Sequence, residues 1–167
     1  MSSTEKENVM ETSSVLKIEP ISEQNQAQVR QFVLDGLAEH FGFLDTTLNP
    51  DLHNIIDHYT NQGHVFLVGT VGNEAVCCGA LIPYDDHTGR IVRMSVKKTY
   101  RRHGYASRII EALEKFAMHK SYSSIILKTL AHWEDAVGFY QSKGYEQNRL
   151  EGDSVVMTKA LLTTKSC

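Results

Sequence analysis

The chain has 167 residues and a formal net charge of −3, which is the size of one ordinary domain. Hydrophobic residues make up 41% of it, enough to bury a core, and its apolar stretches are far shorter than the roughly 20 residues that span a membrane. A small negative charge does not predict binding to nucleic acid or to a membrane surface. We therefore expect a globular protein with neither kind of partner.

The two ends of the chain are more polar than its middle. Residues 1–14 contain a run of Ser, Thr, Glu, Lys and Asn, a composition typical of a flexible tail. We expect a single folded domain over residues 15–162, followed by a short C-terminal tail at residues 163–167.

A strand and two helices are predicted in the first third of the chain. Residues 15–21 alternate between apolar and polar side chains, as strands do. Ser22 is suited to cap the helix that follows. Asn49-Pro50 marks the start of a second helix, because Asn caps helices and Pro tolerates the first helical position, and Gly63 is suited to end it.

Three strands joined by short turns follow, at residues 64–70, 74–84 and 90–96. Gly72 and Asn73 form a two-residue turn of the kind that closes hairpins. Strands with such short connections lie antiparallel, so we expect these three to be antiparallel neighbours.

The second half of the chain alternates helices and strands. A helix at residues 107–119 precedes a strongly apolar strand at residues 124–130, which should lie parallel to the strand before that helix, with a right-handed crossover. A helix at residues 134–143 and a hairpin of residues 145–150 and 155–162 complete the chain.

These elements predict an α/β (α+β) fold with a mixed, mostly antiparallel sheet of about seven strands and flanking helices. A single parallel crossover excludes the doubly wound dinucleotide fold, which repeats such units. The exposed edge strands of the last hairpin favour a homodimer.

The basic turn Arg101-Arg102-His103-Gly104-Tyr105-Ala106 lies between a strand and a helix. A helix start exposes about four backbone N–H groups and carries roughly half a positive charge. Gly104 lets an anion approach the backbone closely, and the two arginines add charged donors. The turn therefore predicts a phosphate or diphosphate site; the alternative is an ordinary solvated loop.

The cysteines and histidines do not predict a metal site. Cys77 and Cys78 are adjacent in an apolar run, so their side chains should point to opposite faces of a strand and pack as thiols. Free thiols indicate a reducing, cytoplasmic compartment. None of the eight histidines has a zinc-binding spacing, and we expect no metal.

Two motifs together resemble the GNAT superfamily of acyl-CoA-dependent N-acetyltransferases, over roughly residues 15–162. The first runs from Met94 and Val96 through Arg101-x-x-Gly104-x-Ala106. The second is Ala136-x-x-Phe139-Tyr140-x-x-x-Gly144-Tyr145. They occur in the expected order on matching elements.

The resemblance implies a splayed central pair of parallel strands and a site for acetyl-CoA, the co-substrate. In such folds the pantetheine arm acts as a surrogate strand between the splayed pair, and the diphosphate rests on the backbone N–H groups of the basic turn. The cofactor-binding residues that it implies are Met94, Val96, Arg101, Arg102, His103, Gly104, Tyr105, Ala106 and Ser107.

Tyr140 matches the position that points at the thioester sulfur in this family. A free thiol has a pKa of ~8.5 and a tyrosine ~10, so a phenol can protonate the departing thiolate. We therefore expect Tyr140 to be the catalytic acid; the alternative is that it only packs beside Phe139.

The sequence departs from the family at two positions. Many relatives carry a glutamate as the general base where this chain has Arg90, so the base is absent or comes from Glu39, His40, Asp85 or His87 acting through water. Relatives also often have an asparagine where this chain has Trp133, which covers the cofactor or simply packs.

The expected activity is transfer of an acetyl group from acetyl-CoA to a primary amine of a small molecule, by direct attack in a ternary complex. Residues 36–52 should wall the acceptor side, and their aromatic residues with Glu39, Asp45 and Asp51 would suit a cationic amine. A peptide or protein amine as acceptor, and a CoA-binding module without turnover, remain as alternatives.

Overall fold

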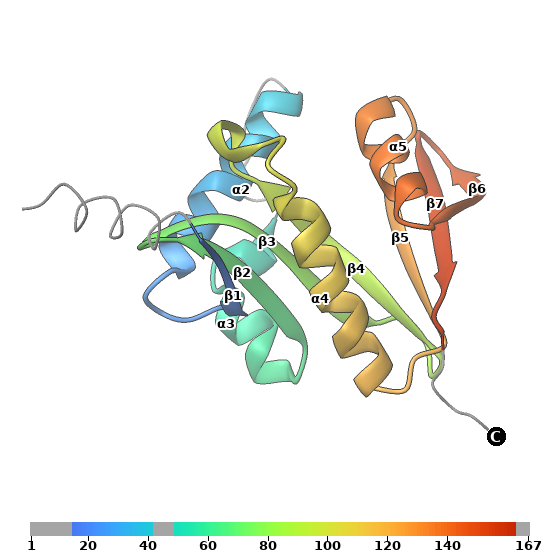
Figure 1. Cartoon of the computed structure of the whole chain (residues 1–167), viewed down its shortest axis with the longest axis horizontal. Coiled ribbons are helices and arrows are strands. Elements are labelled where there is room, and N and C mark those ends of the chain that lie inside the picture. Colours follow the sequence, from blue (N-terminus) through green and yellow to red (C-terminus); the bar gives the residue numbers. More distant parts are fainter. Residues whose placement is uncertain (1–14, 42–48, 163–167) are drawn as a thin grey trace, which may run out of the picture.

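The computed structural model describes residues 15–41 and 49–162 and shows a seven-stranded sheet with helices on both faces (Figure 1). No helix within these ranges is long and apolar enough to cross a membrane. The elements, with η for 3₁₀ turns, are β1 (Leu16–Pro20), α2 (Gln26–Phe41), η2 (Pro50–Leu52), α3 (Ile55–His58), η3 (Thr60–Gln62), β2 (Val65–Val71), β3 (Glu74–Pro83), β4 (Thr88–Val96), η4 (Lys98–Tyr100), α4 (Tyr105–His119), β5 (Ser124–Leu130), α5 (Glu134–Ser142), β6 (Glu146–Glu151) and β7 (Ser154–Ala160).

The strand order is β1-β2-β3-β4-β5-β7-β6, and every neighbouring pair is antiparallel except β4 and β5. The mixed, mostly antiparallel sheet and its single parallel pair are therefore confirmed. The two tails predicted at the ends of the chain lie outside the described residues. β6 is the outer edge and all six of its residues are exposed, while the homodimer stays a prediction.

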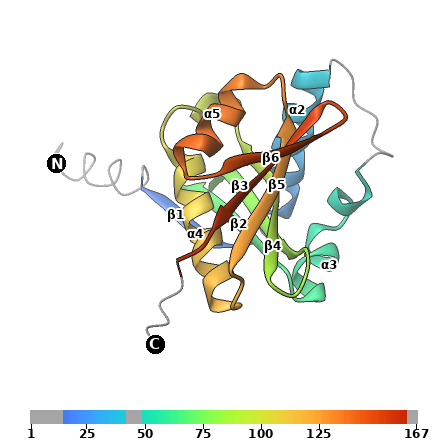
Figure 2. The ribbon, with the colours of Figure 1, turned by 90° about the vertical axis from the view of Figure 1, so that its right-hand side faces the viewer.

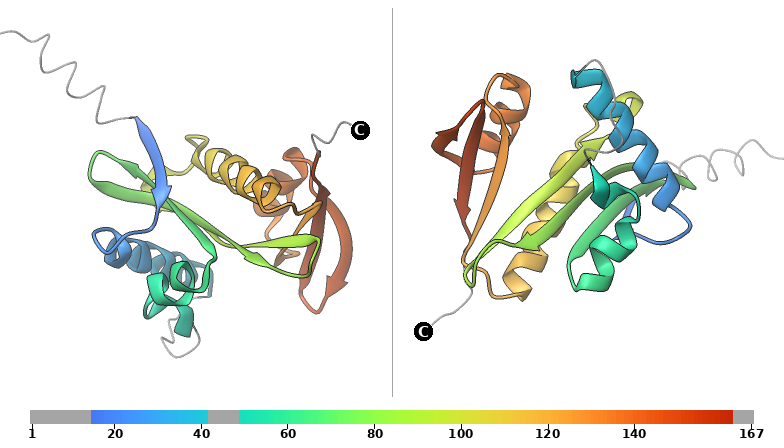
Figure 3. Two further views of the ribbon diagram at one scale, coloured as in Figure 1. Left: turned by 90° about the horizontal axis from the view of Figure 1, so that it is seen from below. Right: turned by 180° about the vertical axis from the view of Figure 1, so that it is seen from behind.

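The parallel pair is short, and its strands then part. β4 pairs with β5 only over Thr88–Arg90 against Ser124–Ile126. Beyond these pairs β4 continues to Val96 and β5 to Leu130 without further pairing, and the two strands form a V that opens upward in Figure 1 and is seen from behind in Figure 3. The splayed pair implied by the family resemblance is thus present.

A bulge in β4 lies shortly beyond Arg90, where the pairing with β5 ends. The register with β3 shifts between Cys78 and Ala80, so that Cys78 faces Ser95 and Ala80 faces Val92. The bulge contains Arg93, whose φ of +59° lies in the left-handed region that residues other than glycine and asparagine seldom adopt. Bulges bend a strand and increase its twist, which turns the end of β4 away from β5.

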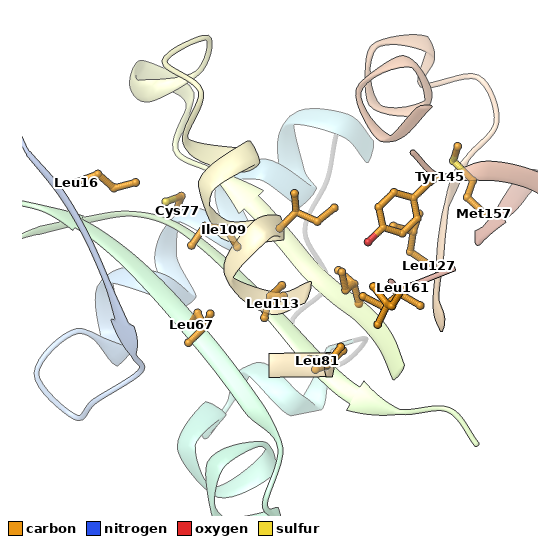
Figure 4. Close-up of a cluster of buried hydrophobic side chains, with 14 of the residues drawn as sticks. Leu16, Leu67, Cys77, Leu81, Ile109, Leu113, Leu127, Tyr145, Met157 and Leu161 are labelled. Atoms are coloured by element: carbon orange, nitrogen blue, oxygen red, sulfur yellow. The ribbon is translucent and has the colours of Figure 1, made fainter. Parts of the chain in front are cut away.

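Two apolar layers cover the sheet. α4 lies on one face, and α2 and α3 lie on the other (Figure 3). Ile109 and Leu113 of α4 pack with Cys77, and this cluster continues across the V to Tyr145 and Met157 (Figure 4). The C-terminal leaf of β5, β7 and β6, which faces the viewer in Figure 2, is therefore held to the rest by the α4 side of the core.

The opposite layer contains Cys78, so the two adjacent cysteines do face opposite sides of β3, as predicted. Cys78 packs with Val29, Phe32 and Tyr59 from the α2 and α3 side. Both thiols are free and buried, and burial raises the pKa of Cys77 to about 11. They are packing residues and remain protonated at neutral pH.

The N-terminal helices differ from the sequence prediction. α2 begins at Gln26, and it is the carbonyl of Ser22, rather than its hydroxyl, that accepts the Gln26 N–H (3.0 Å). The single helix predicted from Asn49-Pro50 to Gly63 is instead three short turns, η2, α3 and η3. Asn54 caps a new start by accepting the Asp57 N–H (3.0 Å), which breaks the helix.

Gly79 is required by the tight contact between β3 and α4. A Cβ at this position would lie 2.6 Å from Met94 Sδ and 2.8 Å from Ile109 Cγ2. We predict that Gly79→Ala lowers the free energy of unfolding by about 1–3 kcal/mol, as overpacked cores do, measured by urea denaturation.

Gly36→Ala is the matched control, because Gly36 lies inside α2 and a Cβ there would meet only Ser95 Oγ at 3.8 Å. Alanine should stabilise this helix by roughly 0.5–1 kcal/mol. Equal effects of the two substitutions would show that the β3–α4 contact is not tight.

Candidate active site

The basic turn is built around an uncapped helix start. α4 begins at Tyr105, and no side chain caps it. The first N–H to find a carbonyl within the helix is that of Arg108, which donates to Gly104 (3.3 Å). No acceptor among the described residues binds the N–H groups of Tyr105, Ala106 and Ser107, which leaves them available to an anion.

Gly104 leaves open space over this helix start. Its φ is +79°, and a Cβ built on it would contact nothing within 4 Å. The backbone thus combines a left-handed conformation, which glycine adopts without strain, with a surface that a phosphate can reach. These features fit the diphosphate of a CoA-type ligand.

The two arginines of the turn have different surroundings. Arg101 donates through Nε to the Val96 carbonyl (3.1 Å) and pairs with Glu39 of α2 (3.0 Å). Arg102 has a φ of +67° and is exposed. Arg101 therefore joins the turn to β4 and α2, while Arg102 stands at the surface where a phosphate would approach.

Stacked aromatic rings brace the turn. The Tyr105 ring is stacked 5.6 Å from the ring of His103 and 6.3 Å from that of Tyr100. The Tyr100 hydroxyl donates to Glu74 (2.8 Å), which also pairs with Lys97. These contacts fix η4 and hold the start of α4 near the end of β4.

The open side of β4 presents backbone groups to the gap. The Lys97 N–H donates to the Val76 carbonyl (2.7 Å), so the alternation of an extended strand turns the N–H and C=O of Val96 away from β3. The Val96 carbonyl accepts from Arg101 there. Buried backbone groups need partners, and an extended amide chain in the gap would supply them.

Tyr140 lies on α5, near the C-terminal end of β5. Its half-buried ring contacts Phe139 and Tyr145 edge-on, at 5.2 and 6.0 Å between centroids. Tyr145 is held by a hydrogen bond to Glu114 (2.9 Å). Among the described residues none hydrogen-bonds to the Tyr140 hydroxyl.

Burial raises the pKa of Tyr140 to about 12. The phenol is therefore fully protonated at neutral pH and can act as a hydrogen-bond donor or acid, not as a base. Trp133 stands at the N-cap of α5, and its carbonyl accepts the Val137 N–H (3.0 Å).

The predicted bases have other partners or lie elsewhere. Glu39 is paired with Arg101. Asp85 accepts the His87 N–H (2.8 Å), and this hydrogen bond holds the pKa of that carboxyl below its usual range. Asp85 and His87 precede β4, roughly 20 Å from Met94 at ~3.3 Å per residue, and the His40 side chain lies outside the described part of the structure.

A buried ion pair behind the bulge was missed by the sequence analysis. Arg93 binds Asp51 through two hydrogen bonds, from Nε (2.9 Å) and Nη2 (2.7 Å), and Nη2 also donates to Asn49 Oδ1 (3.0 Å). The Tyr59 hydroxyl donates to Asp51 Oδ2 (2.6 Å). Asn49 stands at the N-cap of η2, before Pro50, as predicted, but its side chain accepts from Arg93 and does not cap the turn.

The carboxylate of Asp51 stays ionised in this pair. Burial acts to raise the pKa of Asp51, but the hydrogen bonds from Arg93 and Tyr59 outweigh it and hold the pKa below its usual range. The signal available in the sequence was a charged residue, Arg93, within the apolar run of residues 91–96.

The side of the sheet where we expect the acceptor is basic in its described part, whereas we expected an acidic rim. Asp51 and Glu39 are both in ion pairs with arginines, and Asp45 lies outside the described residues. A groove of about 410 Å³ between α3, β4 and β5 is lined by Arg90, Arg93 and Lys128, among others. Within the described ranges no group of three or more potential metal ligands occurs.

We predict that Asp51→Asn lowers the free energy of unfolding by about 2–3 kcal/mol, because it leaves the Arg93 charge largely buried and unpaired. The loss should be present in full at neutral pH and shrink as the pH falls below about 4. The folded-state pKa of Asp51 is the lower one, so protonation at acid pH removes the stabilising ion pair from the wild type, which then resembles the variant. Urea denaturation of wild type and variant at several pH values measures it.

The control is Glu19→Gln, which removes a surface pair in which Lys17 Nζ and Glu19 Oε1 are 3.9 Å apart. Exposed pairs contribute little, so its effect should stay within about 0.5 kcal/mol. A similarly small effect of Asp51→Asn would contradict a structural role for the Arg93 pair.

Comparison with known proteins agrees with this geometry. The family model described as Acetyltransferase (GNAT) family matches residues 30–145, more than half of the chain. N-acetylaspartate synthetase of Danio rerio is 31% identical over 124 residues, covering 70% of this chain and 44% of that protein. N-acetyltransferase 8B of Homo sapiens is 28% identical over 111 residues, covering 63% of this chain and 49% of that protein. The chain spans about half the length of these vertebrate relatives.

Solved structures share the fold. An acetyltransferase of the GNAT family from Staphylococcus aureus superposes with a TM-score of 0.79 at 20% identity, covering 89% of this chain and 100% of that one. The PaiA N-acetyltransferase from Thermoplasma acidophilum, in complex with coenzyme A, gives a TM-score of 0.75 at 13% identity, covering 87% and 99%. With the family model spanning the splayed strands, the basic turn and Tyr140, the chain belongs to the GNAT acetyltransferase family.

Proposed function

We propose that the protein transfers an acetyl group from acetyl-CoA to a primary amine of a small molecule, by direct attack in a ternary complex. The observation that carries this proposal is the combination of a V-shaped gap between β4 and β5 with an uncapped helix start beside it. An extended amide chain fits the first and a diphosphate fits the second. One relative's name, N-acetylaspartate synthetase, refers to a small acetylated amine and supports a small-molecule acceptor.

The residues of the chain would bind and orient the two substrates. Arg102, Gly104 and the N–H groups of Tyr105 to Ser107 would hold the diphosphate, while the open edge of β4 from Met94 to Val96 would hold the pantetheine. Acetyl-CoA supplies a thioester, whose C–S bond breaks as the acceptor nitrogen bonds to the acetyl carbon. Positioning of this kind supplies much of the rate enhancement in two-substrate reactions.

Tyr140 would supply the proton for the departing sulfur. Its phenol is protonated at neutral pH because burial raises its pKa to about 12. The hydroxyl, with no partner among the described residues, is available to the thiolate and would regain its proton from water.

The free and buried state of Cys77 and Cys78 supports the reducing, cytoplasmic compartment that we also propose.

We predict that Tyr140→Phe lowers kcat by about 10–100-fold with KM for acetyl-CoA changed less than about twofold, because the acid is lost and the binding surface is kept. Free-thiol release with a panel of amines measures it. The control is Tyr122→Phe, which makes the same change beside Gly89, at the closed end of the V. Unchanged turnover in Tyr140→Phe would remove Tyr140 from the mechanism.

We predict that Gly104→Asp weakens CoA binding at least tenfold in calorimetry. A carboxylate over the helix start would satisfy the free N–H groups and repel the diphosphate. Gly152→Asp is the matched control, because Gly152 also has a positive φ (+59°) and open space around it, but lies in the β6–β7 turn.

Equal CoA affinity in the Gly104 and Gly152 variants would contradict the diphosphate site. Strong CoA binding with no turnover on any amine would instead favour a CoA-binding module. These outcomes separate loss of the ligand site from loss of the reaction.

A further inference from the structure

Two basic side chains stand at the vertex of the V, on its acceptor face. Arg90 is the last residue of β4 that pairs with β5, where it lies opposite Ile126. Lys128 lies two residues after Ile126 on β5. Val92 packs with the α2 and α3 layer and Ile91 with the α4 layer. Because side chains alternate along a strand, Arg90 projects to the α3 side, where it and Lys128 line the same groove.

The charges of this groove do not cancel. Arg93 is neutralised by Asp51, the only carboxylate among the described residues that line it. Lys128 has a solvent-exposed partner, Glu151, with Nζ and Oε1 3.6 Å apart, and such surface pairs contribute little. No carboxylate of the described residues pairs with Arg90. The groove therefore has a positive charge available for an anion.

The size and walls of the groove suit a small organic anion. Its volume is about 410 Å³, within the range of small-molecule sites. Ile82 and Val92, which pack with the α2 and α3 layer, supply apolar wall between the charged groups. A guanidinium such as that of Arg90 binds a carboxylate with two parallel hydrogen bonds, which fixes its orientation as well as its position.

We infer that the acceptor is a primary amine that also carries a carboxylate, and that Arg90 and Lys128 bind this carboxylate. The inference rests on the proposed transferase function and specifies its substrate class. Arg90 then anchors one end of the acceptor at the vertex, and the amine extends along β4 toward Met94, where the thioester would lie.

The same charges would prepare the amine for attack. Positive charges nearby disfavour an ammonium ion and lower its pKa. An amino acid or related compound would therefore bind through its carboxylate and lose an ammonium proton to water. The neutral nitrogen attacks the acetyl carbon, the C–S bond breaks, and the nitrogen releases its second proton to water as the thiolate is protonated. No carboxylate base is needed in β4, where Arg90 stands.

Matched pairs of acceptors test this inference with the full chain and acetyl-CoA. β-Alanine and ethylamine, ornithine and 1,4-diaminobutane, and phenylalanine and 2-phenylethylamine differ within each pair only by one carboxylate. We expect kcat/KM to be at least tenfold higher for the carboxylated member of the pair that is used best. In Arg90→Gln and Lys128→Gln this preference should fall at least fivefold, with Arg90→Lys retaining part of it.

Lys17→Gln is the control, because Lys17 is an exposed lysine on β1, at the far edge of the sheet, and should keep the preference. Acetyl-CoA affinity, measured in parallel, should be the same in all variants. Higher kcat/KM for the decarboxylated members, or an unchanged preference in both groove variants, would overturn the inference and leave the transferase function intact.

A binding measurement keeps the inference testable if no amine is acetylated, an outcome that would contradict the transferase function itself. Succinate, a dicarboxylate without an amine, is titrated into the CoA-loaded protein by calorimetry. We expect saturable binding that weakens at least fivefold in Arg90→Gln. Absence of binding, or equal binding to the variant, would overturn carboxylate recognition by the groove.

Discussion

The parting of β4 and β5 after three residue pairs is the constraint on which the rest of the structure depends. It leaves backbone donors and acceptors without a neighbouring strand, in a protein where such groups normally find partners. The bulge at Arg93 lies beyond the last of these pairs and turns the end of β4 away from β5, and the apolar layer under α4 holds the two leaves together. A site for an extended ligand is thus produced by the sheet itself.

Much of this architecture could be predicted from the sequence because local patterns determine it. The turn at Gly72 and Asn73, the apolar runs of the central strands and the glycine before α4 each depend on neighbouring residues only. The division of residues 49–63 into three turns was not predictable in this way. It combines the Asn54 cap on the Asp57 N–H with a distant contact, the hydrogen bond that Arg93, 44 positions away, donates to Asn49.

The candidate site was predictable to the same extent. The helix start at Gly104 and the position of Tyr140 follow from short motifs. The sign of charge on the acceptor side does not, because Glu39 and Asp51 were read as free acids and are both bound by arginines. Only the fold shows which charged side chains are neutralised in ion pairs and which are not. A chain with a net charge of −3 can therefore present a basic groove.

The pairing of Arg93 with Asp51 also constrains how this sequence can change over generations. The two side chains are mostly buried, with exposed fractions of 20% for Arg93 and 12% for Asp51. Replacing one of them alone leaves the other as an unpaired buried charge, and such a substitution is selected against because it destabilises the fold. Only a simultaneous substitution of both residues would leave stability unchanged. The two sites should therefore covary among descendants of a common ancestor, tying the history of the N-terminal turns to that of the central strand.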